Sequence, residues 1–248
     1  MWFVVKKWVV GVSPRHVLSG ISLFKKNFLV PYQTLAKVFM SSPYPAIAVI
    51  FSGPSGVGKT TVCQQLFALS SNIHFSVSCT TRPPRAGEQA GVHYHYLSPE
   101  EFQRRIEIGE FLEYAQVHQH RYGTLRSEVT PHLAAGRDVI LDIDVQGAQQ
   151  IRKNIEGQAL AARFISVFLL PPSFALLEQR LRGRKTENDA EINRRLEHAR
   201  RELQHWREYD YVLINQEGEM ERTAQLLWSI MQGARCRSCI QGKEFWNE

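Results

Sequence analysis

Four apolar runs recur along the chain, and each has the length of a buried strand. They are AIAVIF, DVILDID, ARFISVFLL and YDYVLIN, in that order. Near-continuous apolar runs are typical of parallel strands that are covered on both faces. Helix-like patterns lie between or after these runs. From Ile47 onward the pattern therefore predicts an α/β fold with a doubly wound parallel sheet.

Two segments interrupt this alternation and predict separate structural parts. Residues 75–127 contain short strand-like stretches and the helical SPEEFQRRIEIG, which predicts a small α+β lobe. Residues 171–206 are dense in arginine and helix formers and predict a helical lid. The remaining segments are the expected core at residues 46–74, 128–170 and 207–234, and a tail at residues 235–248.

The first 45 residues differ from the rest of the chain. They contain no acidic residue, and lysines break their apolar runs too often for a membrane span. We expect a disordered extension, with translation starting at Met40 and the upstream part added by the gene model. The alternatives to this expectation are that the segment targets the protein to an organelle or, less favoured, that it anchors the protein peripherally to a membrane.

The first apolar run leads into the glycine-rich stretch GPSGVGKT at residues 53–60. It fits the pattern G-x-x-x-x-G-K-[ST] and lies between an expected strand and an expected helix, as a phosphate-binding loop requires. Lys59 would reach the terminal phosphates of a nucleotide, and the Thr60 hydroxyl would hold Mg²⁺. The residues expected to contact the nucleotide are Gly53, Pro54, Ser55, Gly56, Val57, Gly58, Lys59, Thr60 and Thr61.

Composition fits a soluble enzyme and leaves the partner open. The 248 residues are 44% hydrophobic, which is enough for a packed core. A net charge of +6 and a pI of about 9.2 suit any polyanion, but no nucleic-acid recognition motif accompanies them. The four cysteines form no spaced framework, which favours a reducing compartment. The CRSC stretch near the C-terminus lacks a second ligand pair for zinc.

Two acids follow the second apolar run. Asp142 and Asp144 end the stretch VILDID, at the strand end where open parallel sheets bind ligands. Strand alternation would place both side chains on the same side of the sheet. A buried acid that caps the next helix is the ordinary alternative.

Arginines gather in the expected lid. Arg180 and Arg184 are four residues apart and share one face of a first helix. After the polar KTEND, a second helix is expected to carry Arg195 beside an apolar side made of Ile192, Leu196, Leu203 and Trp206. A mobile lid with arginines would neutralise charge on a transferring phosphoryl group and exclude water. A solvated face paired with glutamates is the alternative for any single arginine.

The ordered set of motifs resembles guanylate kinases. The set consists of the phosphate loop, SVSCTTRPPRAGE, EFLEYAQ with YGT, ILDIDVQG and the lid arginines, and the resemblance covers residues 47–232 nearly end to end. It implies a P-loop kinase domain at residues 46–234 that moves the γ-phosphoryl group of ATP to GMP, giving ADP and GDP, with Mg²⁺. The implied setting is a cytoplasmic monomer or homodimer that uses ATP and GMP, with dGMP an open question, and no nucleic acid or stable membrane insertion.

The resemblance also implies a GMP site. Arg82 and Arg85, which flank two prolines, would bind the α-phosphate, since guanidinium groups contact phosphate oxygens bidentately. Glu113 would accept the N1–H and the N2 amino group of guanine. Thr124 stands where many relatives carry serine, and it keeps the hydroxyl. The residues implied for GMP are Ser78, Arg82, Arg85, Glu88, Tyr94, Glu113, Tyr122, Thr124 and Asp142.

For phosphoryl transfer, the resemblance implies charge stabilisation and no general base, because the acceptor is already a phosphate oxygen. The cations implied are Lys59, Arg180, Arg184 and Arg195. Thr60 would bind Mg²⁺, with Asp142 or Asp144 acting through water. Asn215, after the last apolar run, resembles a position that contacts the ATP adenine or its loop.

Two other functions compete with this one. A relative of the same fold phosphorylates ribose 1,5-bisphosphate, but the guanine-reading set of Ser78, Glu113 and Thr124 argues against it. The guanylate-kinase-like module of scaffold proteins binds phosphopeptides without catalysis. The presence of Lys59, Thr60 and the lid arginines argues against such a module.

Overall fold

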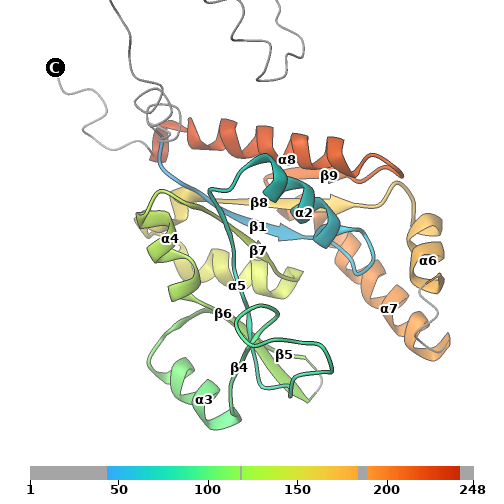
Figure 1. Cartoon of the computed structure of the whole chain (residues 1–248), viewed down its shortest axis with the longest axis horizontal. Coiled ribbons are helices and arrows are strands. Elements are labelled where there is room, and N and C mark those ends of the chain that lie inside the picture. Colours follow the sequence, from blue (N-terminus) through green and yellow to red (C-terminus); the bar gives the residue numbers. More distant parts are fainter. Residues whose placement is uncertain (1–43, 118, 184–188, 241–248) are drawn as a thin grey trace, which may run out of the picture. The chain divides into compact units, whose positions relative to one another are not determined.

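The computed structural model describes residues 44–117, 119–183 and 189–240 (Figure 1). The predictions made for residues 1–43, for Arg184 and for residues 241–248 lie outside these ranges. Within the described ranges the chain forms two β-sheets, one of five strands and one of four.

The larger sheet is parallel, with the strand order β2-β7-β1-β8-β9. Its strands are β1 (Ala48–Ser52), β2 (Ile73–Phe75), β7 (Asp138–Asp142), β8 (Phe164–Leu170) and β9 (Tyr211–Ile214). The predicted α/β fold with a parallel sheet is confirmed, and each apolar run supplies one strand. The fifth strand, β2, has no apolar run, because this short edge strand is only partly buried.

Helices cover both faces of this central sheet (Figure 1). The helices are α2 (Lys59–Leu69), α4 (Thr130–Ala134), α5 (Val145–Ile155) and α8 (Met220–Arg235). Alternate residues of β1 point to opposite faces. Val49 and Phe51 pack with α2 and α8, whereas Ala48 and Ile50 pack with α4 and α5. Both faces of β1 are therefore buried, which explains its continuous apolar run.

The smaller sheet has the strand order β4-β3-β6-β5. Its elements are β3 (Cys79–Thr80), β4 (His95–Tyr96), α3 (Pro99–Glu107), β5 (Phe111–Val117) and β6 (His120–Leu125). Phe102 of α3 stacks on Phe111 of β5 with ring centroids 4.5 Å apart, and Cys79 and Leu125 complete a small separate core. We call β3 to β6 together with α3 the lobe. The domain bounds expected from the sequence stay predictions.

Two helices and a 3₁₀ turn follow β8. They are α6 (Phe174–Arg182), α7 (Asp189–Glu202) and η4 (Leu203–Glu208). The prediction of one helix with Ile192, Leu196, Leu203 and Trp206 on one apolar side is wrong. Ile192 and Leu196 pack on the α2 side of the sheet, whereas Leu203 and Trp206 pack on the α5 side. The change of face follows from the tighter 3₁₀ coil, which has three residues per turn instead of 3.6.

The described residues also include three further 3₁₀ turns. They are η2 (Arg126–Glu128), η3 (Ala159–Arg163) and η5 (Ser238–Ile240). Within the described ranges, every helix is too short or too polar to traverse a lipid bilayer.

A buried ion pair joins the start of β7 to the end of α8. The side chain of Asp138 is fully buried and that of Arg235 is 6% exposed. Asp138 also accepts a hydrogen bond from the backbone N–H of Ile47 at 3.0 Å. Burial raises the pKa of Asp138, and the hydrogen bond from Arg235 opposes that rise.

We expect Asp138→Ala to lower the free energy of unfolding by about 3–5 kcal/mol, because it removes the carboxylate that balances a buried guanidinium. Urea denaturation followed by circular dichroism measures this loss. The control is Glu197→Ala, whose exposed pair with Arg200 spans 3.6 Å. This control should lower the free energy of unfolding by less than about 1 kcal/mol. Equal losses in the two variants would contradict the prediction.

Candidate active site

The glycine-rich stretch at residues 53–60 joins β1 to α2. At Gly53, where φ is 152°, an added Cβ would lie 2.5 Å from the carbonyl oxygen of Leu169. At Gly58, where φ is 105°, it would lie 2.6 Å from the amide nitrogen of Asn215. Both positions therefore require glycine. Because α2 begins directly after Gly58, the positive end of its dipole lies at the loop.

The Lys59 side chain folds back over this loop. Its Nζ donates to the carbonyl oxygen of Gly53 at 2.5 Å and lies 3.6 Å from Oδ1 of Asp142, the last residue of β7. Burial raises the pKa of Asp142, and the ammonium group of Lys59 opposes that rise. One cation thus lies between the loop and the neighbouring strand end.

Asn215 supports the loop from behind. It is 1% exposed, its Nδ2 donates to the carbonyl oxygen of Val57 at 2.8 Å, and its Oδ1 accepts from the Thr223 hydroxyl at 3.2 Å. Both ends of the amide therefore contact protein. In this structure Asn215 orders the phosphate loop.

A cavity of about 330 Å³ lies where the lobe meets the central sheet. It is lined by Ser78, Tyr94, Glu113, Ala115, Tyr122, Gly123, Asp142, Ile143 and Asp144. The structure thus brings together five of the residues implied for GMP, which are Ser78, Tyr94, Glu113, Tyr122 and Asp142. Residues from both sheets line the cavity, so its shape depends on how the lobe is held against the core.

Glu113 is a buried acid of β5 on this cavity. It is 6% exposed, and its Oε1 accepts a hydrogen bond from the Thr124 hydroxyl at 2.7 Å. Burial raises its pKa to about 7, the hydrogen bond from Thr124 opposes the rise, and Asp144 adds to it. Gly147 in the first turn of α5 leaves room for the group, because a Cβ there would lie 3.1 Å from Oε2.

Arg82 and Glu88 form an ion pair at the edge of the lobe. Nη2 of Arg82 donates to Oε1 of Glu88 at 2.8 Å, and Oε2 accepts from the Arg85 backbone N–H and from the Tyr96 hydroxyl, each at 2.8 Å. The hydrogen bond from Arg82 lowers the pKa of Glu88 to about 2. The guanidinium carbon of Arg82 lies 5.4 Å from the ring centroid of Tyr94, which lines the cavity. Glu88 therefore orients Arg82 and its loop.

Of the predicted lid cations, Arg180 contacts the phosphate loop. Its Nη1 donates to the carbonyl oxygen of Val57 at 3.4 Å. Arg195 is half-buried on α7, and Arg184 lies outside the described residues. Thr60, in the first turn of α2, has an exposed side chain.

Asp144 is not part of a strand, so the prediction that it ends the strand together with Asp142 is wrong. The strand ends at Asp142, and Asp144 is the N-cap of α5, where its Oδ1 accepts from the Gly147 backbone N–H at 2.8 Å. The chain turns after Asp142 because α5 begins three residues later, at Val145. The alternative that such an acid caps the next helix is therefore correct for Asp144. Both acids nevertheless line the cavity.

A family model described as guanylate kinase matches residues 46–234. The chain belongs to the guanylate kinase family. The predicted family is therefore confirmed, and the match spans both sheets of the described structure.

Individual members of the family are similar over most of the chain. The guanylate kinase of Thermotoga maritima is 42% identical over 188 residues, which cover 76% of this chain and 87% of that protein. That of Sphingopyxis alaskensis is 47% identical over 169 residues, which cover 68% of this chain and 74% of that protein. A crystal structure of guanylate kinase from Anaplasma phagocytophilum is 32% identical, has a TM-score of 0.61, and covers 80% of this chain and 90% of that one.

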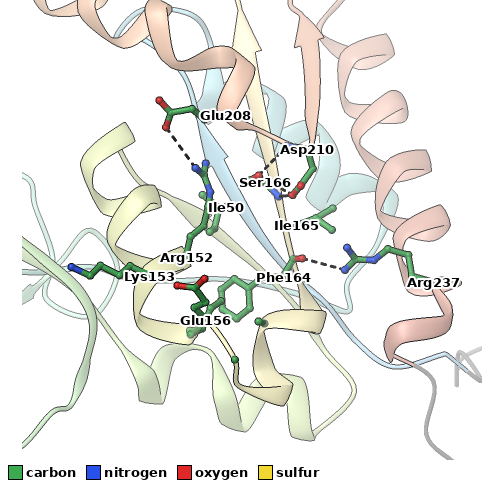
Figure 2. Close-up of a pocket in the computed structure, with 13 residues that line it drawn as sticks. Ile50, Arg152, Lys153, Glu156, Phe164, Ile165, Ser166, Glu208, Asp210 and Arg237 are labelled. Atoms are coloured by element: carbon green, nitrogen blue, oxygen red, sulfur yellow. Dashed lines mark hydrogen bonds and ion pairs between the residues drawn. The ribbon is translucent and has the colours of Figure 1, made fainter.

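This member of the guanylate kinase family has a larger cavity, of about 630 Å³, at the other end of α5. The 11 residues of α5 separate its two ends by about 16 Å. Figure 2 shows Arg152 directed toward Glu208, with Nη1 3.7 Å from Oε2, and Asp210 beside Ser166, whose hydroxyl donates to it at 2.8 Å. In the described structure Nε and Nη2 of Arg152 are buried without a hydrogen-bond partner. The larger cavity is nevertheless the weaker candidate, because its lining includes none of the residues implied for ATP or GMP.

The cysteines have no role in the site. Burial raises the pKa of Cys63 and of Cys79 to about 12, so both thiols stay protonated. Cys236 and Cys239 are free and exposed. Among the described residues, no three His, Cys, Asp or Glu side chains are grouped so that they could hold a metal ion.

Two supporting residues are absent from the sequence-based predictions. Gly147 carries a weak signal, because glycine costs about 1 kcal/mol relative to alanine inside a helix and therefore needs a reason to be there. Thr223 carries none, since its contact with Asn215 depends on how α8 packs beside β9.

We expect the Glu113 carboxyl group to titrate near pH 7 in the folded protein. Thr124→Val should raise this pKa further, because it removes the hydroxyl that donates to the carboxylate. Carbon-detected NMR of protein labelled with ¹³C-glutamate measures both values, and Glu113→Gln identifies the resonance. A wild-type value near the ordinary 4.5 would contradict the prediction.

The same shift has a consequence for stability. The pKa of Glu113 is higher in the folded than in the unfolded chain. The stability that this residue adds to the folded state is therefore fully present below about pH 4.5 and is lost as the pH rises to about 7. Glu113→Gln should flatten the pH dependence of Tm across this window.

Proposed function

We propose that this protein transfers the γ-phosphoryl group of ATP to GMP, giving ADP and GDP. The single observation that carries the proposal is the cavity with the buried Glu113 on one wall and Asp142 on the other, because Lys59 of the phosphate loop lies 3.6 Å from Asp142. The cavity that holds the base-reading carboxyl group therefore extends to Asp142, which Lys59 of the phosphate loop contacts. Membership of the guanylate kinase family supports the same reaction.

Glu113 is the proposed reader of guanine. Its carboxylate accepts the N1–H and the N2 amino group, while Ser78 and Thr124 offer hydroxyl groups beside O6. Adenine would instead present its N1 acceptor to the carboxylate and leave a buried charge unpaired. That mismatch costs about 2–4 kcal/mol, or roughly 30- to 700-fold in selectivity.

The phosphate of GMP is assigned to the edge of the lobe. Arg82 and Arg85 bind the α-phosphate, and the hydroxyl groups of Tyr94 and Tyr122 donate to it. In the present structure Glu88 holds Arg82 by an ion pair of 2.8 Å, so the guanidinium is oriented before the substrate arrives. Pre-ordered side chains lose less conformational entropy when the substrate binds.

The ATP phosphates are assigned to the loop at residues 53–60, the residue Thr61 and the N-terminus of α2. Lys59 and Arg180 neutralise charge on the phosphoryl group as it transfers, and Arg184 and Arg195 of the lid are proposed to join them. No general base is required, because the attacking atom of GMP is a phosphate oxygen.

The donor set suits Mg²⁺. This ion keeps several waters and takes few protein ligands besides substrate phosphates. The exposed Thr60 hydroxyl at the start of α2 and the Asp142 carboxylate beside Lys59 fit that requirement. Asp144 fits less well as a ligand because it already caps α5. When bound, the ion neutralises charge on the β- and γ-phosphates.

No contact in the described structure favours the phosphopeptide-binding module or the ribose 1,5-bisphosphate kinase over this reaction. Neither ligand carries the N1–H and 2-amino pair of guanine that Glu113 is proposed to read. A cytoplasmic location, a monomeric or homodimeric state, and use of dGMP stay predictions.

The test measures ADP release by the full-length protein with ATP, Mg²⁺ and one acceptor at a time, chosen from GMP, dGMP, AMP, UMP, CMP and ribose 1,5-bisphosphate. We expect turnover with GMP, and a loss of about 10³-fold in kcat for Lys59→Ala, the scale on which cations stabilise this transition state. Glu113→Gln should raise KM for GMP and narrow the preference over AMP. A folded protein that binds ATP but uses none of these acceptors would contradict the proposal.

Gly147→Ala tests the space around Glu113. We expect KM for GMP to rise by about tenfold, because the added Cβ lies 3.1 Å from the carboxylate and displaces it. KM for ATP should change less than twofold. The matched control is Gly233→Ala in α8, where an added Cβ meets nothing within 4 Å. An unchanged KM for GMP in Gly147→Ala would show that Glu113 does not read the acceptor.

A further inference from the structure

Two short segments of chain connect the lobe with the central sheet. Residues 76–78 lead from β2 into β3, and residues 126–129 lead from β6 through η2 toward α4. Glu128 lies in the second connection, and its side chain is 15% exposed. Its carboxylate contacts the other connection and both sheets.

Glu128 accepts three hydrogen bonds from three different parts of the fold. Its Oε2 accepts from Nε2 of His74 in β2 at 3.0 Å and from the backbone N–H of Val77 at 2.9 Å. Its Oε1 accepts from Nε2 of His95 in β4 at 2.9 Å. Because a carboxylate can only accept, each imidazole carries a proton on Nε2. One side chain therefore joins the central sheet, the first connection and the lobe.

We propose that Glu128 is a positioning residue that sets the orientation of the lobe against the central sheet, and with it the geometry of the GMP cavity. The inference rests on the proposed phosphorylation of GMP. It assigns to Glu128 and its two histidine partners a role in acceptor binding, although none of the three lines the cavity.

The neighbours of His95 in sequence and in space belong to the cavity. In β4 the side chains alternate, so His95 points to the side opposite Tyr94 and Tyr96. Tyr94 lines the cavity, and the Tyr96 hydroxyl donates to Glu88, the partner of Arg82. The backbone N–H of His95 also donates to the carbonyl oxygen of Ser78, another lining residue, at 2.9 Å. Glu128 thus contacts β4 on the side of His95, whereas the tyrosines on the opposite side belong to the proposed phosphate site.

The charges around Glu128 favour its ionised form. Burial acts to raise its pKa, but the hydrogen bonds from Val77, His74 and His95 outweigh burial and lower it. His132 of α4 stacks on His74 with ring centroids 3.6 Å apart. Burial lowers the pKa of His132, and the neighbouring His74 and Arg137 lower it further. The Cys79 thiol, with its raised pKa, adds no charge.

The sign of these shifts sets the pH range of the contact. The pKa of Glu128 is lower in the folded than in the unfolded chain. The stability that this residue adds to the folded state is therefore present above about pH 4.5 and is lost as the pH falls through its pKa in the folded chain. The contact is therefore intact at neutral pH, where the kinetics are to be measured.

The cluster is a set of hydrogen bonds and not a metal site. Its nitrogen-to-oxygen distances of 2.9–3.0 Å are those of hydrogen bonds. In the part of the chain that the structure describes, no group of three or more His, Cys, Asp or Glu side chains is placed to hold a metal.

The kinetic test compares Glu128→Ala with wild type. We expect KM for GMP to rise by about ten- to a hundredfold, the scale of a small misplacement of binding groups, while KM for ATP changes less than twofold. The matched control is Glu101→Gln in α3. It removes the negative charge that accepts hydrogen bonds from two arginines at 2.6–2.9 Å, but this residue spans no connection to the core. Its KM values should equal those of wild type.

A second pair of variants keeps Glu128 in place. His95→Phe removes the donor but keeps a ring, and should raise KM for GMP about tenfold. His95→Gln offers an amide donor near the position of Nε2 and should restore most of the affinity. If both His95 variants and a folded Glu128→Ala match wild type, or if KM for ATP and KM for GMP rise together, the positioning role is wrong.

A readout without substrate separates this inference from the proposed reaction. Spin labels are attached at Glu107→Cys on α3 and Gln225→Cys on α8, in a protein in which Cys236 and Cys239 are changed to serine. Electron paramagnetic resonance then measures the distance between the two labels, and so between the lobe and the core. In Glu128→Ala this distance distribution should shift or broaden, whereas in Glu101→Gln it should not. An unchanged distribution overturns the inference even if GMP is the acceptor, and a changed one supports it even if GMP is not.

Discussion

The parallel pairing of β1 with β7 and β8 is the constraint on which the site depends. In this register Phe51 lies opposite Asp142 and Ser52 lies opposite Phe168, so the three strands end at one edge of the sheet. The phosphate loop leaves β1 at that edge, and Lys59 therefore reaches Asp142 without a long connection. A slip of one residue would turn every side chain of β1 to the other face and remove both of its cores.

Burial gives the acids of the site different properties although they lie close together. Glu113 and Asp142 have raised pKa values because they are removed from water, whereas Glu88 has a lowered pKa because Arg82 donates to it. Glu113 reads guanine only as the carboxylate, the form that its burial disfavours, whereas the ionised Glu88 suits the orientation of an arginine. The same chemical group thus serves two tasks, and its surroundings decide which.

The sequence predicted those parts of the structure that depend on local pattern. Four strands and the phosphate loop follow from apolar runs and a local motif, because neighbouring residues determine them. That Ser78 and Glu113 line one cavity was implied by the family resemblance. The end of β7 and the face change at Leu203 did not follow, because a cap and a 3₁₀ turn decide them. The contact of Glu128 with His74 spans 54 positions, and no local pattern indicates it.

The lobe is inserted between β2 and β7 of the central sheet, and its two connections lie side by side, because Glu128 of the second accepts from the backbone N–H of Val77 in the first. It has its own apolar core, and its strand β5 also packs on α5, where Leu112 is buried in the core on that side of the central sheet. Two parts that are rigid in themselves and share two adjacent connections can rotate about those connections. Since the cavity takes its walls from both parts, the few hydrogen bonds at the connections have more effect on its shape than equally strong bonds elsewhere. Polar contacts between the two connections are therefore a place where substrate binding can be tuned without any change in the residues that touch substrate.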